Sequence, residues 1–271
     1  MNSLQLYRQL TKRLEEVSDC AQFESKCLLE HFLSLSLSDI YSEKEINDDL
    51  SELYIATEKR LNNIPLQYIV GKWEFMDCEF LLNKNVLIPR PETELLCECL
   101  ADKITPESVV YDLCSGTGCV AISVQKLSGA KVYAFEKYDG AYEMLLKNIT
   151  LNSCAVIPVK FDICKKPDLD IEKSDFILSN PPYIRSEDIA SLQKEVLNEP
   201  LTALDGGNDG YLFYRAINQN FMPLLKNGGY LAVEISENQE TEVINIFSSL
   251  NHIKTIKDYN GIKRVVVFRK G

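Results

Sequence analysis

From residue 107 to residue 269, apolar stretches of strand length alternate with stretches of helical periodicity, and this alternation constrains the fold most strongly. It is typical of a mostly parallel sheet with helices on both faces. The pattern predicts strands at 108–113, 131–136, 155–162, 175–180, 228–235, 252–257 and 262–269, and helices at 118–127, 138–151, 187–197 and 209–226. Asn260-Gly261 lies between the last two strands and favours a hairpin turn, so the sheet is predicted to end in an antiparallel pair.

Residues 1–64 carry three apolar stripes with helical spacing instead, and these predict a small helical unit. Ser42 followed by Glu45 predicts a capping box at the start of its third helix. The unit contains no convergent polar cluster, which favours a docking role over a chemical one. We therefore assign residues 1–75 to a helical docking domain with its linker and residues 76–271 to a second domain.

The stretch that joins these regions carries short strand patterns at 78–82 and 86–88, which flank Asn83-Lys84-Asn85 and predict a hairpin. Pro91, followed by acidic residues, predicts the start of a helix that ends near Lys103.

Composition narrows the class of protein. No apolar run reaches the roughly 18 residues that a membrane span needs, and the N-terminus lacks the pattern of a signal peptide, so we expect a cytoplasmic protein that binds no membrane. The nine cysteines form no Cys-x-x-Cys pair and only two histidines accompany them, so we expect reduced thiols and no metal site. A net charge of −11 argues against direct binding of a nucleic-acid backbone and favours a basic protein partner. A monomer is the favoured state.

Asn180-Pro181-Pro182-Tyr183 directly follows the apolar stretch that predicts a buried strand. The two prolines end the strand and hold Asn180 extended, at the sheet edge where ligands bind in open α/β folds. The side-chain oxygen of Asn180 and the backbone oxygen of Pro181 can each accept one N–H of a planar amine. Tyr183 is placed to stack on such a group. We therefore predict that Asn180, Pro181 and Tyr183 are catalytic and that all four residues bind substrate.

A second motif, Cys114-Ser115-Gly116-Thr117-Gly118, links a predicted strand to a predicted helix, and Glu136 ends the next strand. Glycines let a backbone approach a ligand closely, and a carboxylate at Glu136 can accept the hydroxyls of an adenosine ribose. These features fit both NAD and S-adenosylmethionine. Hydride transfer needs a proton donor, usually His or a Tyr–Lys pair, and neither histidine lies at the carboxyl end of a predicted strand. Methyl transfer needs an oriented nucleophile, which the Asn180 motif supplies.

Five motifs in order make the chain similar to the HemK/PrmC family of protein N5-glutamine methyltransferases: residues 65–71, 88–94, 112–118, 180–183 and 198–210. The resemblance implies a class I, Rossmann-like fold, S-adenosyl-L-methionine as cofactor, and a role in translation termination. Its implied substrate is the glutamine of the Gly-Gly-Gln loop in class I peptide chain release factors. The cofactor residues that it implies are Cys114, Ser115, Gly116, Thr117, Gly118, Glu136 and Asn180, with Pro181, Pro182 and Tyr183 framing the glutamine amide. Family members often have an aromatic residue after the Asp that ends the third strand, whereas Ile163 follows Asp162 here, so we expect an aliphatic contact to adenine.

Other targets stay open at this point. A glutamine of a ribosomal protein would suit the same motifs. Asn-Pro-Pro-Tyr is also shared with enzymes that methylate adenine N6 in nucleic acids, although the acidic charge fits these poorly. The most distant alternative is a protein-binding module without activity.

Overall fold

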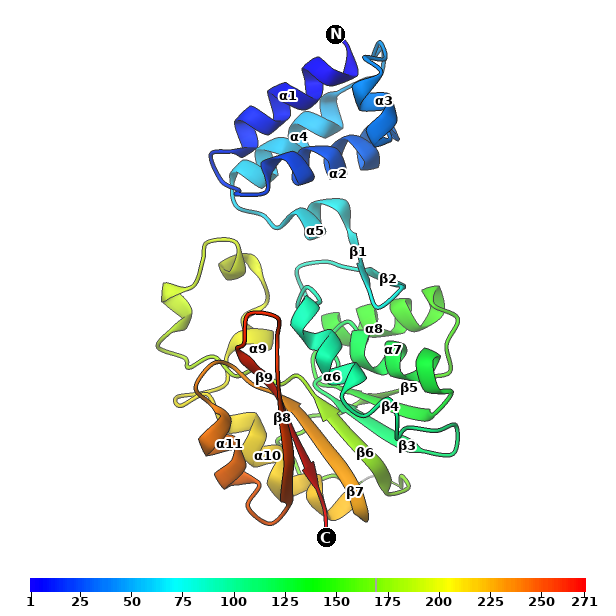
Figure 1. Cartoon of the computed structure of the whole chain (residues 1–271), viewed down its shortest axis with the longest axis vertical. Coiled ribbons are helices and arrows are strands. Elements are labelled where there is room, and N and C mark those ends of the chain that lie inside the picture. The colour runs from blue at the N-terminus through cyan, green and yellow to red at the C-terminus, as the bar shows by residue number, and fades with distance from the viewer. Residues whose placement is uncertain (169) are drawn as a thin grey trace. The chain divides into compact units, whose positions relative to one another are not determined.

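The computed structural model describes residues 1–168 and 170–271, which form two compact units (Figure 1). One unit contains residues 1–72 together with residues 193–198. The other contains residues 73–192 and 199–271. The short segment 193–198 therefore groups with the helical unit, although its place in the sequence lies within the α/β region.

The larger unit is built on a seven-stranded sheet with the order β5-β4-β3-β6-β7-β9-β8. The strands are β3 (Val109–Leu113), β4 (Lys131–Glu136), β5 (Ile157–Lys160), β6 (Ser174–Ser179), β7 (Leu225–Glu234), β8 (Asn251–Lys257) and β9 (Lys263–Arg269). Strands β3 to β7 pair in parallel, and β9 is antiparallel to both β7 and β8. The predicted α/β class with an antiparallel C-terminal pair is confirmed.

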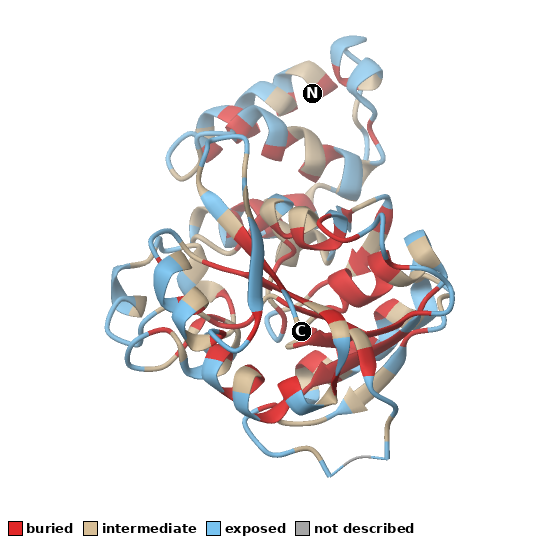
Figure 2. Ribbon diagram, turned by 60° about the horizontal axis from the view of Figure 1, so that its bottom comes forward, coloured by how far each residue is buried: buried red, intermediate tan, exposed pale blue. Residues whose placement is uncertain are grey.

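Burial follows the position of each strand in the sheet (Figure 2). Every residue of the inner strand β3 is buried, as expected for a parallel strand covered on both faces. The edge strands β5 and β8 are mostly exposed or half-buried. A core cluster between one face of the sheet and the helices that cover it includes Tyr111, Phe135, Tyr214, Phe221 and Phe268.

Helices cover both faces of the sheet, with α6, α7 and α8 on one side and α10 and α11 on the other (Figure 1). Their bounds are α6 (Glu94–Glu98), α7 (Cys119–Ser128), α8 (Asp139–Leu151), α9 (Leu201–Leu204), α10 (Leu212–Asn220) and α11 (Glu240–Ile246). Short 3₁₀ turns are η1 (Pro91–Thr93), η2 (Ile189–Ser191) and η4 (Met222–Leu224). None of the helices within the described residues is both long enough and apolar enough to cross a bilayer.

The predicted helix 187–197 is wrong, because that stretch forms only the 3₁₀ turns η2 and η3 (Val196–Asn198). Ser186 immediately precedes this predicted helix and would be its N-cap, but its hydroxyl donates to the Asp205 carboxylate at 2.7 Å instead. Leu192 is extended, with ψ near 159°, which stops helical propagation after η2. The helix that opens at Pro91 also ends early, at Glu98.

The predicted hairpin around residues 83–85 is wrong as well. The hairpin forms earlier, between β1 (Lys72–Phe75) and β2 (Cys78–Leu81). Its turn residues Met76 and Asp77 both have positive φ, the requirement of the type I′ turn that matches strand twist. Asn83 instead accepts a backbone hydrogen bond from Val86 in a local turn.

The smaller unit contains α1 (Ser3–Leu14), α2 (Ala21–Leu33), α3 (Leu37–Tyr41), α4 (Ser51–Leu61) and α5 (Leu66–Val70), together with η3. The predicted capping box at Ser42 and Glu45 is wrong, because Ser42 is the C-cap of α3. Capping boxes occur instead at Asn2 with Gln5 and at Ser36 with Asp39.

A buried ion cluster attaches segment 193–198 to this unit. Arg60 is 2% exposed and donates to both carboxylate oxygens of Glu24, at 2.7 and 3.0 Å. It also donates to Glu195 at 2.9 Å. Nearby, the side chain of Asn198 donates to the backbone oxygen of Asn63 at 3.0 Å. One guanidinium therefore balances two carboxylates and holds the segment in place.

We predict that Arg60→Met lowers the free energy of unfolding by about 3–5 kcal/mol, because it leaves the buried Glu24 carboxylate unpaired. The matched control is Arg13→Met, which removes the partly exposed Arg13–Glu58 pair and is expected to cost about 0–1 kcal/mol. Urea unfolding measures both. Equal, small losses in the two variants would contradict the structural role of Arg60.

Candidate active site

The site forms at the point in the sheet where successive strands of the chain stop being added on one side of β3 and begin to be added on the other. From β3, the sheet continues through β4 and β5 on one side and through β6 and β7 on the other. Ligands bind at such switch points, beyond the carboxyl ends of the strands. Leu113 at the end of β3 pairs with Ser179 at the end of β6, and the Ser179 hydroxyl donates to the Leu113 oxygen at 2.7 Å. The next residues, Cys114 and Asn180, therefore emerge side by side.

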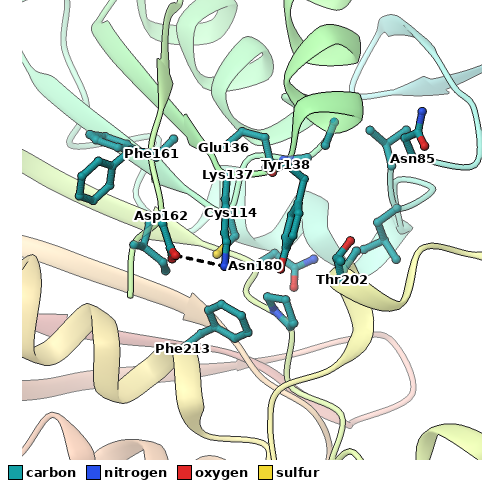
Figure 3. Close-up of a pocket in the computed structure, with 18 residues that line it drawn as sticks. Asn85, Cys114, Glu136, Lys137, Tyr138, Phe161, Asp162, Asn180, Thr202 and Phe213 are labelled. Carbon is teal, nitrogen blue, oxygen red and sulfur yellow. Dashed lines mark hydrogen bonds and ion pairs between the residues drawn. The ribbon is translucent and has the colours of Figure 1, made fainter. Parts of the chain in front are cut away.

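A cavity at this edge, here called the main cavity, has a volume of about 620 Å³ including the part open to solvent (Figure 3). Of the predicted site residues, it brings together Cys114, Gly116, Glu136, Ile163, Asn180 and Pro182.

A second, smaller cavity of about 390 Å³, here called the side cavity, shares Leu87, Cys114, Gly116 and Asn180 with the main cavity. Its lining adds the predicted residues Ser115 and Thr117, and also includes Arg90, Thr93 and Asp112. Asn180 thus lies where the two cavities meet.

Three predicted residues line neither of these cavities: Gly118, Pro181 and Tyr183. Pro181 is buried, and Tyr183 directs its hydroxyl towards Glu234, 3.5 Å from Oε1. Gly118 has a φ of 82°, and a Cβ there would lie 2.4 Å from the side chain of Leu145. A side chain at Gly118 would therefore be strained by the positive φ and would require the tip of Leu145 to move.

Gly116 differs from Gly118 in what surrounds it. Its φ is 53°, and a Cβ there would meet no atom within 4 Å. The glycine leaves open space beside both cavities, so a side chain would enter room that a ligand can use.

Glu136 is held at the carboxyl end of β4 by two backbone donors. Its Oε2 accepts from the N–H of Gly116 at 3.0 Å and its Oε1 from the N–H of Tyr138 at 2.7 Å. Burial raises the pKa of Glu136, and these hydrogen bonds counteract that rise. A carboxylate oxygen can accept two hydrogen bonds, so each oxygen keeps capacity for a hydroxyl of a bound ribose.

Aromatic side chains form much of the remaining wall of the main cavity. Tyr138, Phe161 and Phe213 line it together with the expected Ile163 (Figure 3). The sequence motifs did not indicate these rings, although Tyr138 follows the predicted Glu136 by two residues. Asp162 also lines the cavity and pairs with Lys137 at 3.1 Å. The wall is therefore suited to a flat, largely apolar ring.

A hydrogen-bonded chain leads from Asn180 into the protein. The Asn180 Nδ2 donates to the Thr93 hydroxyl at 3.1 Å, and that hydroxyl donates to Oε2 of Glu234 at 2.7 Å. Thr93 and Glu234 are each 2% exposed. Burial raises the pKa of Glu234 to about 7, although the Thr93 hydrogen bond lowers it. Neither residue was a predicted site residue, but both belong to patterns singled out above, the 88–94 motif and the strand 228–235.

The 198–210 motif packs against the backbone of the Asn180 motif. A Cβ on Gly206 would lie 2.7 Å from the Cα of Tyr183, and one on Gly210 would lie 2.6 Å from the Tyr183 oxygen. Glu199 is buried, accepts from the N–H of Ile88 at 3.1 Å and pairs with Arg90. Three of the sequence motifs therefore meet in one site.

The strand order, with a carboxylate at the end of β4 and a cavity at the switch point, defines a class I methyltransferase that uses S-adenosylmethionine. The fold is shared with the crystal structure of a methyltransferase from Pyrococcus furiosus, with a TM-score of 0.53 and 18% identity over 71% of this chain and 88% of that chain.

Family models assign both regions of the chain. Residues 5–71 match the PrmC N-terminal domain and residues 91–223 match the methyltransferase small domain. A release factor glutamine methyltransferase of Thermodesulfovibrio yellowstonii is 33% identical, with coverage of 91% of this chain and 92% of the relative. One of Geobacter sulfurreducens is 35% identical, with coverage of 93% and 90%. The chain belongs to the release factor glutamine methyltransferase family.

The two glycines of the 114–118 motif provide a matched pair of variants. We predict that Gly116→Ala weakens binding of S-adenosylmethionine, because the added methyl enters the cavities, while the melting temperature changes less than in Gly118→Ala. Gly118→Ala is expected to destabilise the fold by at least about 1–3 kcal/mol, because its methyl overlaps Leu145. Calorimetry and thermal melting measure both effects. Unchanged cofactor affinity in Gly116→Ala would contradict the placement of the ligand.

The burial of the Asp112 carboxyl makes the stability of the fold depend on pH. The carboxyl is 1% exposed, and burial raises its pKa from 3.8 to about 7, although a hydrogen bond from the Ala121 N–H opposes this. Between these values the folded state holds a proton that the unfolded state releases, so this contribution to stability is lost as the pH rises.

We therefore expect the melting temperature of Asp112→Asn, relative to the wild type and without cofactor, to be higher at about pH 8 than at about pH 5. Thermal melts of the two proteins in the same buffers measure this difference. A difference that does not vary with pH would show that Asp112 is already ionised in the folded protein at the lower pH.

Proposed function

We propose that this protein transfers a methyl group from S-adenosyl-L-methionine to the side-chain amide nitrogen, N5, of the glutamine in the Gly-Gly-Gln motif of class I peptide chain release factors. The names of its relatives support this substrate. The observation that carries the proposal is the position of Asn180, which lies where the two cavities meet and has its Nδ2 already bound to Thr93.

The residues of the main cavity fit the proposed cofactor. The Glu136 carboxylate is placed to accept the ribose hydroxyls, and the open space beside Gly116 admits the chain of the ligand. Ile163, Tyr138 and Phe161 provide apolar walls for the adenine. When bound, the cofactor supplies a methyl group activated by its attachment to a positively charged sulfur.

Asn180 and Pro181 prepare the substrate in this proposal. An amide nitrogen is a poor nucleophile, because its lone pair is delocalised into the carbonyl. Two acceptors, the Oδ1 of Asn180 and the backbone oxygen of Pro181, would bind its two N–H groups and fix its direction. Positioning of this kind supplies on the order of 7–11 kcal/mol in the best intramolecular reactions. Orientation is thus the main contribution of these residues.

The helical unit is proposed to dock the release factor. Phe23, Tyr41 and Ile55 are each more than half exposed on it, so apolar side chains are accessible to a partner. The net charge of −11 suits a basic protein.

Mass spectrometry of a purified class I release factor, incubated with this protein and S-adenosylmethionine, tests the proposal. We expect one added methyl group on the Gly-Gly-Gln glutamine. Asn180→Ala is expected to reduce turnover by about 100-fold or more, in the range seen when one positioned hydrogen-bonding group is removed from an active site. Cofactor affinity should fall much less, since only part of the proposed contact of Asn180 is with the cofactor.

Asn251→Ala is the matched control, because Asn251 is exposed at the start of the edge strand β8. It should retain wild-type turnover. A release factor that stays unmodified with the wild-type protein, or normal turnover in Asn180→Ala, would refute the proposal.

A further inference from the structure

The orientation of the Asn180 carboxamide decides whether the proposed site works. A carboxamide has an oxygen that accepts hydrogen bonds and a nitrogen that donates them, on opposite sides of one plane. If the carboxamide is rotated by 180°, it presents its own N–H groups to the N–H groups of the incoming glutamine, and the two sets of donors repel each other. The shape of an asparagine side chain hardly distinguishes the two orientations, so a neighbouring group has to select one.

The Thr93 hydroxyl makes that selection through its single hydrogen. The hydroxyl donates this hydrogen to Oε2 of Glu234, at 2.7 Å. In its ionised form, which predominates above the pKa of about 7, the carboxylate offers no hydrogen in return. The hydroxyl oxygen can therefore only accept from Asn180. The Nδ2 of Asn180 lies 3.1 Å away and supplies the N–H. The opposite orientation would place Oδ1 against the Thr93 oxygen, with no hydrogen between the two.

The fold holds these three groups in place without help from solvent. Val233 pairs with Ser179, so the register of β6 and β7 brings Glu234 to the same level as Asn180. Thr93 lies at the end of η1, whose first residue is Pro91. With Thr93 and Glu234 each 2% exposed, water has little access to compete for these hydrogen bonds.

We infer that Thr93 and Glu234 are positioning residues for methyl transfer, which turn the Oδ1 of Asn180 towards the substrate amide. Neither residue needs to contact the substrate for this role. The inference deepens the proposed function and rests on it for its kinetic consequence.

Two substitutions at Thr93 separate this role from simple packing. Thr93→Val keeps the shape and removes the hydroxyl, while Thr93→Ser keeps the hydroxyl and removes the methyl. We expect Thr93→Val to lower kcat for the release factor by about 100-fold, the loss expected from a misplaced reacting group. The KM for the release factor should change much less, and Thr93→Ser should recover most of kcat. Equal loss in both variants, or wild-type kcat in Thr93→Val, would overturn the inference.

Glu234→Gln provides a second variant of the same shape. Its amide can donate to Thr93, which frees the Thr93 hydrogen for Oδ1 of Asn180 and permits the wrong orientation. We expect a lower kcat with a melting temperature close to that of the wild type. An unchanged kcat would show that the Glu234 carboxylate does not determine the direction of the hydrogen bond between Asn180 and Thr93, and would overturn its positioning role.

A readout without substrate separates failure of this inference from failure of the proposed function. The side-chain NH₂ signal of Asn180 in a ¹H–¹⁵N spectrum is assigned by its loss in Asn180→Ala. We expect it to shift and to exchange faster with water in Thr93→Val, and to remain near its wild-type position in Thr93→Ser. A wild-type signal in Thr93→Val would overturn the inference even if the release factor is methylated. The expected signals, obtained with a release factor that stays unmodified, would uphold the orientation and refute only the proposed function.

Discussion

The pairing of β3 with β6 is the constraint on which the site depends. Two parallel strands in register end at the same level, so whatever follows Leu113 and whatever follows Ser179 must meet. The hydrogen bond from the Ser179 side chain to the Leu113 oxygen closes the end of this pair. A glycine loop and an asparagine that are 64 residues apart in numbering, at 116 and 180, thereby line the same two cavities.

Buried carboxylates gather at this edge of the sheet. Asp112, Glu136 and Glu234 belong to β3, β4 and β7, and each is 6% exposed or less. Backbone N–H groups or a hydroxyl bind each of them, yet burial still raises the pKa of all three. In their ionised forms, these carboxylates favour a ligand with positive charge over an anionic one. A sulfonium cofactor fits this preference, whereas the phosphates of a dinucleotide do not.

The sequence predicted elements well where burial alone determines them. All seven strands of the main sheet occur near their predicted positions. The inner strands β3 and β6 are short, largely buried apolar stretches, whereas the exposed edge strand β8 pairs with β9 across the predicted Asn260-Gly261 turn. Predictions that relied on polar side chains near the ends of elements were less reliable. Ser42 and Ser186 have the chemistry of helix caps, but Ser42 ends α3 and the hydroxyl of Ser186 donates to a distant aspartate.

The site shows the same difference between local and long-range information. Cys114, Gly116, Glu136 and Asn180 were identifiable from their position after a strand, and they line the cavities or hold their edge. Phe213 reaches the main cavity from α10, 77 residues beyond Glu136, with no local pattern to indicate it. Thr93 contacts Glu234 across 141 residues of sequence, and spacing along the chain carries no information about such a pair.

Segment 193–198 gives the chain an unusual connectivity. Because it belongs to the helical unit, the backbone passes between the two units at residues 72–73, 192–193 and 198–199. A protease that cuts only the first of these junctions produces two separate chains, 1–72 and 73–271, which the ion pair between Arg60 and Glu195 still holds together. A single crossover between two relatives near residue 72 would combine Arg60 of one protein with the residue at position 195 of the other. The helical unit and segment 193–198 are therefore expected to change together in evolution.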